Sequence, residues 1–242
     1  MDFTIRIANT TILIHSVYPG LYVTYKNFLV EDIGIPDLEI RVDEDMIAAE
    51  YERFEQAGEQ VPTLKMAESY LVQRRIAEEL LSRDTILMHG AVVAADKACY
   101  MFTAPSGTGK TTHVQKWLVK HNNSFIVNGD KPLIRLTETQ AIACGTPWCG
   151  KENQGENAMV PLKAIVLMER GEGNKMEEVT FGRAFPFLLQ QTYRPSDPVK
   201  MKKSLTLLSK LNGRVRFYRF VFNNMKDDAF SVSYQALTGN NK

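Results

Sequence analysis

Residues 99–120 read CYMFTAPSGTGKTTHVQKWLVK, and this stretch decides the fold. The apolar run Cys99–Phe102 is typical of a buried strand, and residues 111–120 have the composition of a helix. Between them, residues 104–111 read APSGTGKT, which fits the pattern G-x-x-x-x-G-K-[ST] with Ala104 in place of the first glycine. A strand, a glycine-rich loop and a helix in this order predict a phosphate-binding loop.

The retained positions of this loop each have a physical reason. Gly107 and Gly109 let the backbone turn so that successive N–H groups converge on phosphate oxygens. The N-terminus of the following helix also favours an anion. We expect Lys110 to neutralise the β- and γ-phosphates of a nucleoside triphosphate and Thr111 to bind the Mg²⁺ that bridges them. The predicted nucleotide-binding residues are Pro105, Ser106, Gly107, Thr108, Gly109, Lys110, Thr111, Thr112 and Lys151.

A Mg²⁺ site beside a triphosphate also needs a carboxylate. The first candidate is Asp130 in the run FIVNGDKP, and we expect its strand to lie next to the strand that carries the loop. The same residues also fit a surface turn, so that alternative stays open. The second candidate is Glu169, which follows the apolar run 165–168 and precedes a solvated turn.

The N-terminal part of the chain is predicted to be rich in strands. Alternating apolar residues indicate strands on both sides of a turn at residues 8–10, and further strands at residues 22–25 and 38–42. The segments 45–60 and 66–82 have the composition or periodicity of helices. We expect residues 1–62 to form a small β-rich domain.

The remaining residues, 63–242, are predicted to form one α/β domain with a mixed sheet that carries the loop. Short apolar or alternating runs predict strands at residues 86–88, 91–94, 125–127, 133–134, 142–144, 165–168 and 214–222. Helices are predicted at residues 183–193, 198–212 and 227–237.

Composition limits the classes of partner and the cellular location. The net charge of +1 gives no bulk attraction to nucleic acid or to an anionic membrane. The three cysteines form no CxxC pair, so a zinc site is not expected. The N-terminal residues MDFTIRIANT lack the pattern of a signal peptide, and no apolar run approaches the ~20 residues that span a bilayer. We therefore expect a cytoplasmic protein that binds neither nucleic acid nor membrane.

The order of these motifs resembles the catalytic domain of HPr kinase/phosphorylase and its phosphoenolpyruvate carboxykinase-like relatives, which include small peptide-cluster serine kinases. The likeness rests on His89-Gly90 before the loop, on SGTGKTT at residues 106–112 and on Gly129-Asp130 after the next strand. It covers residues 85–170 well, is weaker over residues 171–240 and is absent for residues 1–60. The resemblance implies an α/β fold with an HPr kinase C-terminal-like P-loop core.

The resemblance also implies an activity. A kinase of this group uses ATP and Mg²⁺ to phosphorylate a hydroxyl, here a serine of a peptide or protein. Lys110 would be catalytic, Thr111 and Asp130 would bind the metal, and Asp130 or His89 would accept the proton of the hydroxyl. Family members are often hexamers, so a homo-oligomer is compatible with the resemblance.

One departure from the family keeps other functions open. The family has two aspartates where this chain has Gly129 and Asp130. A nucleotide-binding regulatory protein without phosphoryl transfer is therefore one alternative, and a kinase of a small molecule such as an amino acid is another. The choice between ATP and GTP also stays open.

Other residues have both a functional and a structural interpretation. His89 is either a base or a hydrogen-bonded core histidine, and His113 is expected to be neutral and near the site. In the segment GTPWCGKEN, residues 145–153, Lys151 is predicted to stabilise charge on the transferred phosphoryl group. An ordinary loop anchored by Trp148 is the alternative. Arg194 is either a phosphate-binding arginine or a surface residue.

Overall fold

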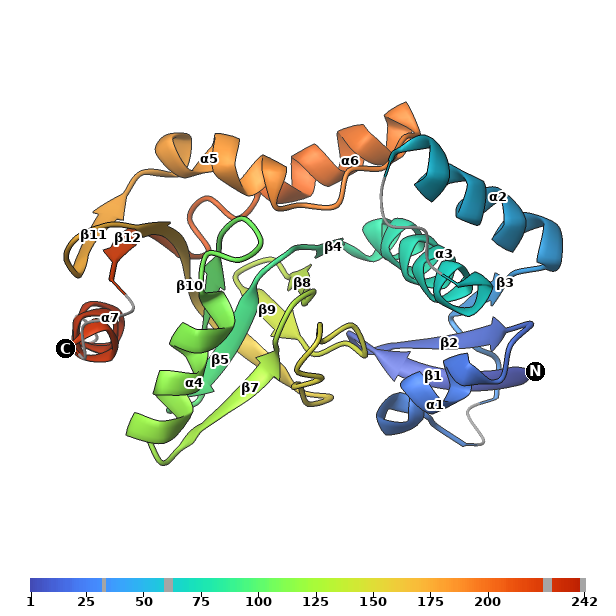
Figure 1. The fold of residues 1–242 in the computed structure, drawn as a ribbon, viewed down its shortest axis with the longest axis horizontal. Helices are drawn as coiled ribbons and strands as arrows, with labels where there is room; N and C mark the ends of the chain where they lie inside the picture. The colour runs from blue at the N-terminus through green and yellow to red at the C-terminus, as the bar shows by residue number, and fades with distance from the viewer. Residues whose placement is uncertain (32–33, 59–62, 224–227, 240–242) are drawn as a thin grey trace. The chain divides into compact units, whose positions relative to one another are not determined.

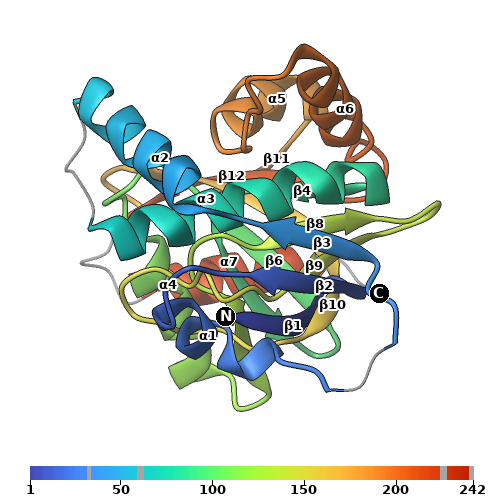
Figure 2. The ribbon, with the colours of Figure 1, turned by 90° about the vertical axis from the view of Figure 1, so that its right-hand side faces the viewer.

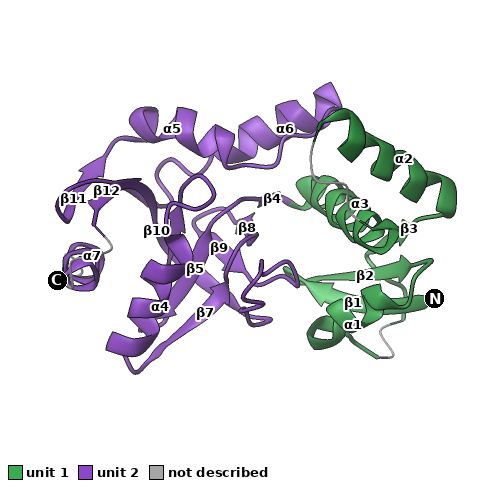
Figure 3. Ribbon diagram, viewed as in Figure 1, with its two compact units in different colours: residues 1–83 green, residues 84–242 purple. Residues whose placement is uncertain are grey.

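The computed structural model describes residues 1–31, 34–58, 63–223 and 228–239 of the chain (Figure 1). The described chain divides into two compact units, Met1–Arg83 and Asp84–Lys242 (Figure 3). The predicted domain boundary after residue 62, the end of the helix expected at residues 45–60 and the start of the helix expected at residue 227 lie outside the described residues.

The first unit is a small α/β unit. Its elements are β1 (Asp2–Ile7), β2 (Thr10–His15), α1 (Gly20–Thr24), a 3-10 turn (Lys26–Phe28), β3 (Leu38–Arg41), α2 (Glu44–Gln56), α3 (Leu64–Glu79) and a second 3-10 turn (Leu80–Arg83). Among the described residues the sheet has three strands in the order β1-β2-β3; β1 is antiparallel and β3 parallel to β2. Helix α3 lies within this unit and buries Leu71, Val72 and Ile76.

Two predictions for the first unit can be compared with its structure. The turn between the first two strands is present, and Ala8 and Asn9 take the positive φ angles of 50° and 57° that close a tight hairpin. The strand predicted at residues 22–25 is wrong, because α1 occupies this position. Leu21, Tyr25 and Phe28 are buried at intervals of four and three residues, which is the spacing of one helical face.

The second unit is built on a large mixed sheet. Its elements are β4 (Thr85–Leu87), β5 (Ala91–Ala95), β6 (Ala98–Thr103), α4 (Lys110–Lys120), β7 (Ser124–Asn128), β8 (Leu133–Leu136), β9 (Ala141–Cys144), β10 (Met159–Arg170), β11 (Lys175–Val179), α5 (Phe181–Gln190), α6 (Pro198–Ser209), β12 (Arg216–Phe222) and α7 (Ala229–Thr238). In the described residues the sheet has nine strands; its main path is β4-β8-β9-β10-β6-β5-β7, and β12 pairs with β10 and β11.

Strand β11 was not predicted from the sequence. Its residues KMEEV show no apolar alternation, because it pairs only with β12 and two of its side chains are acidic. Glu177 and Glu178 form ion pairs with Arg219 and Arg216 of β12. Cross-strand charge pairs therefore accompany this strand, together with the packing of Met176 and Val179.

Helices lie against both faces of this sheet. Helices α4 and α7 share one core with β6, β10 and β12, in which Trp117, Phe102 and Phe220 are buried. On the other face α5 contacts β12 through Phe181 and Phe217. Figure 2 shows α5 and α6 on one side of β12 and α7 on the other. No helix in the described part of the chain combines the length and apolar character needed to cross a membrane.

Strand β5 lies between β6 and β7 and is antiparallel to both. The expectation that the strand before Asp130 lies directly beside the loop-bearing strand is therefore wrong. Because both neighbours oppose β5, β6 and β7 run parallel to each other, and β10 is also parallel to β6. The ends of β6, β7 and β10 and the start of β5 thus meet at one edge of the sheet.

His113 lies in the core of this unit and not at the edge. Its ring contacts those of Phe102 and Phe220, and its Nε2 lies 3.1 Å from the hydroxyl of Ser233. Burial lowers the pKa of His113 to about 3, so the ring is neutral as expected.

This buried histidine predicts a pH-dependent stability. An unfolded histidine takes up a proton near pH ~6.5, whereas His113 in the folded protein stays neutral down to about pH 3. The unfolded state therefore binds more protons in this window, so stability falls as the pH is lowered through it. We expect His113→Gln to remove up to about 1.4 kcal/mol per pH unit of this slope.

Urea denaturation of the parent and of His113→Gln between about pH 7 and about pH 5 measures this contribution. Other groups titrate equally in both proteins, so only the difference between the two slopes reports on His113. Identical slopes would contradict the assignment.

Candidate functional site

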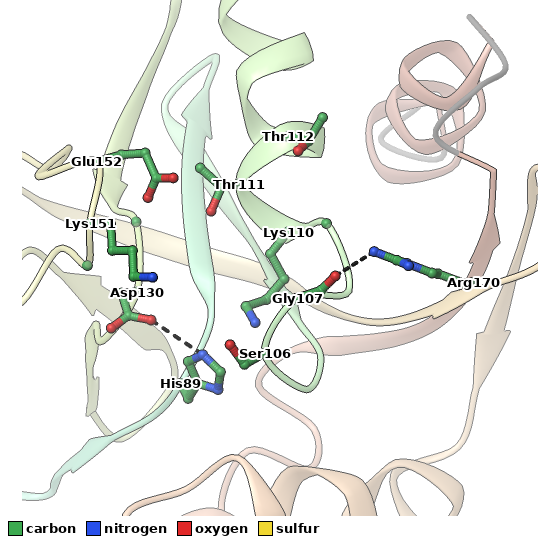
Figure 4. Close-up of a pocket in the computed structure, with 13 residues that line it drawn as sticks. His89, Ser106, Gly107, Lys110, Thr111, Thr112, Asp130, Lys151, Glu152 and Arg170 are labelled. Atoms are coloured by element: carbon green, nitrogen blue, oxygen red, sulfur yellow. Dashed lines mark hydrogen bonds and ion pairs between the residues drawn. The ribbon is translucent and has the colours of Figure 1, made fainter. Parts of the chain in front are cut away.

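A cavity of about 550 Å³ opens at the sheet edge where β6, β7 and β10 end. The residues that line it are His89, Ser106, Gly107, Gly109, Lys110, Thr111, Thr112, Gly129, Asp130, Gly150, Lys151, Glu152 and Arg170. The predicted residues from four separate stretches of sequence are thus brought together around one cavity (Figure 4). Of the predicted nucleotide-binding residues, Pro105 and Thr108 belong to the loop but are not among the residues that line it.

The loop between β6 and α4 depends on left-handed backbone at two glycines. Gly107 has φ of 76° and Gly109 has φ of 116°, a region that side chains disfavour. Ala104 is fully buried and does not take a positive φ, which explains why alanine is tolerated there. The Thr108 hydroxyl donates to the carbonyl oxygen of Pro105 at 2.8 Å and closes the loop on itself.

Lys110 is the first residue of α4, and its ammonium turns back into the loop. Its Nζ donates to the carbonyl oxygens of Ala104 at 2.8 Å and Pro105 at 3.3 Å. Burial lowers the pKa of Lys110, while the negative charge of Asp130 opposes that shift. Both hydrogen-bond acceptors of this cation are neutral carbonyls, so the Lys110 ammonium can attract an anion in the cavity.

A buried hydrogen-bond network positions Asp130. The side-chain oxygen of Asn128 accepts from the backbone N–H groups of Asp130 and Lys131, at 2.8 and 2.7 Å. The Asn128 amide donates to the hydroxyl of Thr146, which in turn donates to the carbonyl of Lys131. The segment is therefore a turn, as one interpretation predicted, but its side chains are fixed from the interior and its aspartate faces the cavity.

His89 is held between Asp130 and Gln191. Its Nε2 lies 3.3 Å from Oδ1 of Asp130, and its Nδ1 lies 2.9 Å from the side-chain oxygen of Gln191. A protonated ring can donate to both oxygens; if the Gln191 amide is turned over, a neutral ring can accept at Nδ1 and donate at Nε2. In either form both ring nitrogens are engaged.

Asp130 is kept ionised by its surroundings. Burial alone would raise the pKa of its carboxyl group, but the hydrogen bond from His89 and the charges of Lys131, His89 and Lys110 hold the pKa below its ordinary value. An ionised carboxylate can bind a cation or accept a proton.

Gly129 occupies the position at which the sequence resemblance implies the first of two aspartates. The structure gives a steric reason for glycine at this position. A Cβ atom at this position would lie 3.0 Å from the carbonyl oxygen of Cys149 and 3.1 Å from that of Gln154. Both contacts are to backbone, which cannot swing away as a flexible side chain can. The 149–154 loop therefore occupies the space that a second aspartate would need.

Glu152 was missed by the sequence analysis, although it directly follows the predicted Lys151. Both line the cavity, on the side of Asp130 and Thr111 in Figure 4. Among the described residues, none forms an ion pair or a hydrogen bond with the Glu152 carboxylate. The signal that could have found it is the segment 145–153 itself, since Lys151 of this segment was predicted to act on the transferred phosphoryl group. Trp148 is buried, so the loop is also anchored as the alternative interpretation required.

Arg170 is a second residue that sequence reasoning missed. It ends β10, and its guanidinium donates to the carbonyl oxygens of Thr108 at 3.1 Å and Gly107 at 2.5 Å. The neighbouring Glu169, the second candidate for a metal-binding carboxylate, forms an ion pair with Arg219 instead and does not line the cavity. Alternation along the strand explains this, because consecutive residues point to opposite faces.

Two further residues lie away from the cavity or are unsuited to its chemistry. Arg194 is exposed and is not among the residues that line the cavity. Cys149 is buried, and burial raises the pKa of its thiol, which therefore stays protonated and is a poor nucleophile.

Comparisons with known proteins add little to this geometry. Searches of family models and of curated proteins found no match to the sequence. Among solved structures, the chain is similar to the Hpr(Ser) kinase/phosphatase from Coxiella burnetii, with 10% identity and a TM-score of 0.39. The match covers 62% of this chain and 95% of that one. At so low a TM-score we take neither fold nor function from it.

The contacts of Arg170 predict how the loop responds to its removal. By holding the carbonyl oxygens of Gly107 and Thr108, Arg170 fixes the two peptide groups on either side of Thr108. We expect Arg170→Ala to speed amide hydrogen exchange at Thr108 and Gly109 by about tenfold, since a charge-assisted hydrogen bond contributes about 1.5 kcal/mol or more.

Arg183→Ala is the matched control, because Arg183 is exposed and is not among the residues that line the cavity. Exchange in the control should equal that of the parent. Unchanged exchange in Arg170→Ala would mean that the loop holds its shape without this side chain.

Proposed function

We propose that the second unit binds Mg²⁺-ATP in this cavity and transfers the γ-phosphate to a hydroxyl. The observation that carries the proposal is that Lys110 and Thr111 share one cavity with Asp130 and Glu152. A cation at the N-terminus of a helix that follows a glycine-rich loop can bind the phosphates, and carboxylates beside it can bind the metal ion.

The oxygen atoms present fit a magnesium ion. Thr111, Asp130 and Glu152 offer a hydroxyl and two carboxylates, which are the hard oxygen ligands that Mg²⁺ prefers. No group of three His, Cys, Asp or Glu side chains in the described residues could hold a metal alone. This agrees with the usual mode of binding, in which one or two carboxylates and the substrate phosphates share the ion. When bound, the ion would neutralise charge on the β- and γ-phosphates.

The protein groups around the cavity would have separate roles in the transfer. Lys110 would stabilise the charge of the phosphates, and Lys151, on the opposite side of the cavity from the loop in Figure 4, would stabilise the transferred group. Asp130 would accept the proton of the acceptor hydroxyl while the hydroxyl oxygen attacks phosphorus and the bond to the leaving ADP breaks.

Of the two candidate bases, the geometry supports Asp130. Both nitrogens of His89 already face other oxygens, and its Nε2 is directed at Oδ1 of Asp130. The second carboxylate oxygen, Oδ2, lies 4.0 Å from the ammonium of Lys131 and has no closer ionic partner in the described part of the chain. His89 would then orient Asp130 and would not touch the substrate.

The acceptor class rests on the sequence resemblance to HPr kinase, which points to a serine of a peptide or protein. A small hydroxyl-bearing molecule such as an amino acid is the alternative acceptor. Incubation with labelled ATP and each acceptor class separates them. A protein that binds ATP but labels no acceptor would instead be a nucleotide-binding regulator, the function that the missing second aspartate suggests.

Lys110 gives the first test of this proposal. We expect Lys110→Ala to weaken ATP binding by about 10- to 100-fold, because a charged hydrogen-bond donor to phosphate is lost. Transfer should fall by about 100-fold or more, since charge develops further in the transition state. Calorimetry and a labelled-phosphate assay measure the two effects. Lys120→Ala, at the other end of α4, is the control that should change neither.

Glu152 tests the metal ligands. We expect Glu152→Gln to raise the Mg²⁺ concentration needed for half-maximal transfer by about tenfold, because one anionic oxygen is lost from the site. Glu156→Gln is the control, since Glu156 belongs to the same loop but does not line the cavity. An unchanged Mg²⁺ requirement in Glu152→Gln would remove this residue from the metal site while leaving nucleotide binding at Lys110 intact.

A further inference from the structure

A second cavity of about 300 Å³ lies in the same unit, away from the loop. Its lining residues are Tyr100, Lys163, Ala164, Gly213, Arg214, Val215, Arg216, Tyr218 and Leu237. Tyr100, Ala164 and Arg216 are register neighbours on the parallel strands β6, β10 and β12. Tyr100 is near the start of β6 and Arg216 begins β12, whereas Ala164 is midway along β10. The cavity is therefore at the opposite end of these strands from the loop, about 20 Å along β10 from Arg170.

The cations of this second cavity are not balanced by acids. Three of its lining residues are basic, and none of the described residues that line it is acidic. Arg216 is neutralised from outside the cavity by Glu178, which accepts two hydrogen bonds from it. Within the described residues, neither Lys163 nor Arg214 forms an ion pair with a carboxylate. Two positive charges therefore remain.

Arg214 is fixed in place without losing its charge. Its guanidinium donates to the carbonyl oxygens of Thr137, Glu138 and Lys210, at 3.1, 2.9 and 2.7 Å. These acceptors are neutral and use three of its five N–H groups. A cation held by backbone carbonyls is rigid and keeps donors for a further partner.

Lys163 is directed to the cavity by an irregularity in its strand. The register between β10 and β6 shifts between Leu162 and Ala164, so Lys163 is the extra residue of a bulge. Bulges change the direction of a side chain, and here the exposed lysine lines the cavity. Lys163 therefore adds an exposed cation to the same lining as Arg214.

The walls of the cavity are largely apolar and aromatic. Tyr100 and Tyr218 are buried tyrosines, and Val215 and Leu237 are buried aliphatic residues. The Arg216 guanidinium lies over the Tyr218 ring at 5.2 Å and fixes its plane. Burial raises the pKa of Tyr100 to about 12 and also raises that of Tyr218, so both hydroxyls stay protonated. The Tyr218 hydroxyl donates to the carbonyl oxygen of Ala236 at 3.5 Å.

We propose that this cavity binds a small organic dianion with an apolar body, either a phosphate monoester or a dicarboxylate. Two unbalanced cations match a double negative charge, and the aromatic and aliphatic walls match the body of the ligand. The site is independent of the nucleotide-binding proposal, because it shares no lining residue with the first cavity.

Residue-specific NMR tests this assignment on the full chain. We expect phenyl phosphate to give saturable shifts at the backbone amides of Gly213, Arg214 and Val215, and phenol, which is neutral, to give none. Phthalate distinguishes the two sources of dianion: tighter binding of phthalate than of phenyl phosphate indicates a dicarboxylate, and tighter binding of phenyl phosphate indicates a phosphate ester.

Lys163→Glu is the decisive variant, because this exposed side chain can change without loss of the fold. We expect it to weaken phenyl phosphate binding by about tenfold or more, whereas the control Lys202→Glu, on an exposed position of α6, leaves it unchanged. Equal affinity in parent and Lys163→Glu, or shifts confined to residues 106–112, would overturn the proposal.

Discussion

The position of β5 between β6 and β7 is the constraint on which the candidate site depends. Because β5 is antiparallel to both neighbours, β6 and β7 end at the edge where β5 begins. The chain therefore passes that edge three times, with His89 before β5, the glycine-rich loop after β6 and Asp130 after β7. Backbone hydrogen bonds reinforce the meeting point: the N–H of Gly90 donates to the carbonyl of Asp130, and Thr103 donates to the carbonyl of His89.

Local signals in the sequence were enough to predict the loop and most strands of the second unit. Cys99–Phe102 is apolar and Gly107 and Gly109 need left-handed backbone, so short-range chemistry decides this part. The order of strands depends on pairing between distant segments, and for that reason the place of β5 was not predicted. The helix α1 was missed because Leu21, Tyr25 and Phe28 show their common face only over about two turns, a span that extends past the end of α1.

The candidate site shows the same division between local and distant information. Lys110, Thr111 and Asp130 are recognisable because a motif or a strand end marks them. Arg170 and Glu152 reach the cavity through long-range folding, and neither has a local pattern that indicates contact with the loop. Gly129 adds a steric constraint that no single sequence reveals, because the backbone of the 149–154 loop fills the space beside it. Glu152 of that same loop brings a carboxylate to the cavity, so the loop that excludes one acidic side chain supplies another.

The arrangement of charge follows from the layers of the second unit. Helices cover both faces of the sheet, and the cations that line the two cavities lie where a strand begins or ends or where the backbone is irregular. At the edge near the loop, cations of both Lys110 and Lys151 share a cavity with two carboxylates, and such a mixture suits an anion that carries a metal ion. At the opposite edge, Lys163 and Arg214 face a cavity that the described residues line without any acid. A metal ion would be repelled there, so the two ends of the same strands are suited to two different classes of anion.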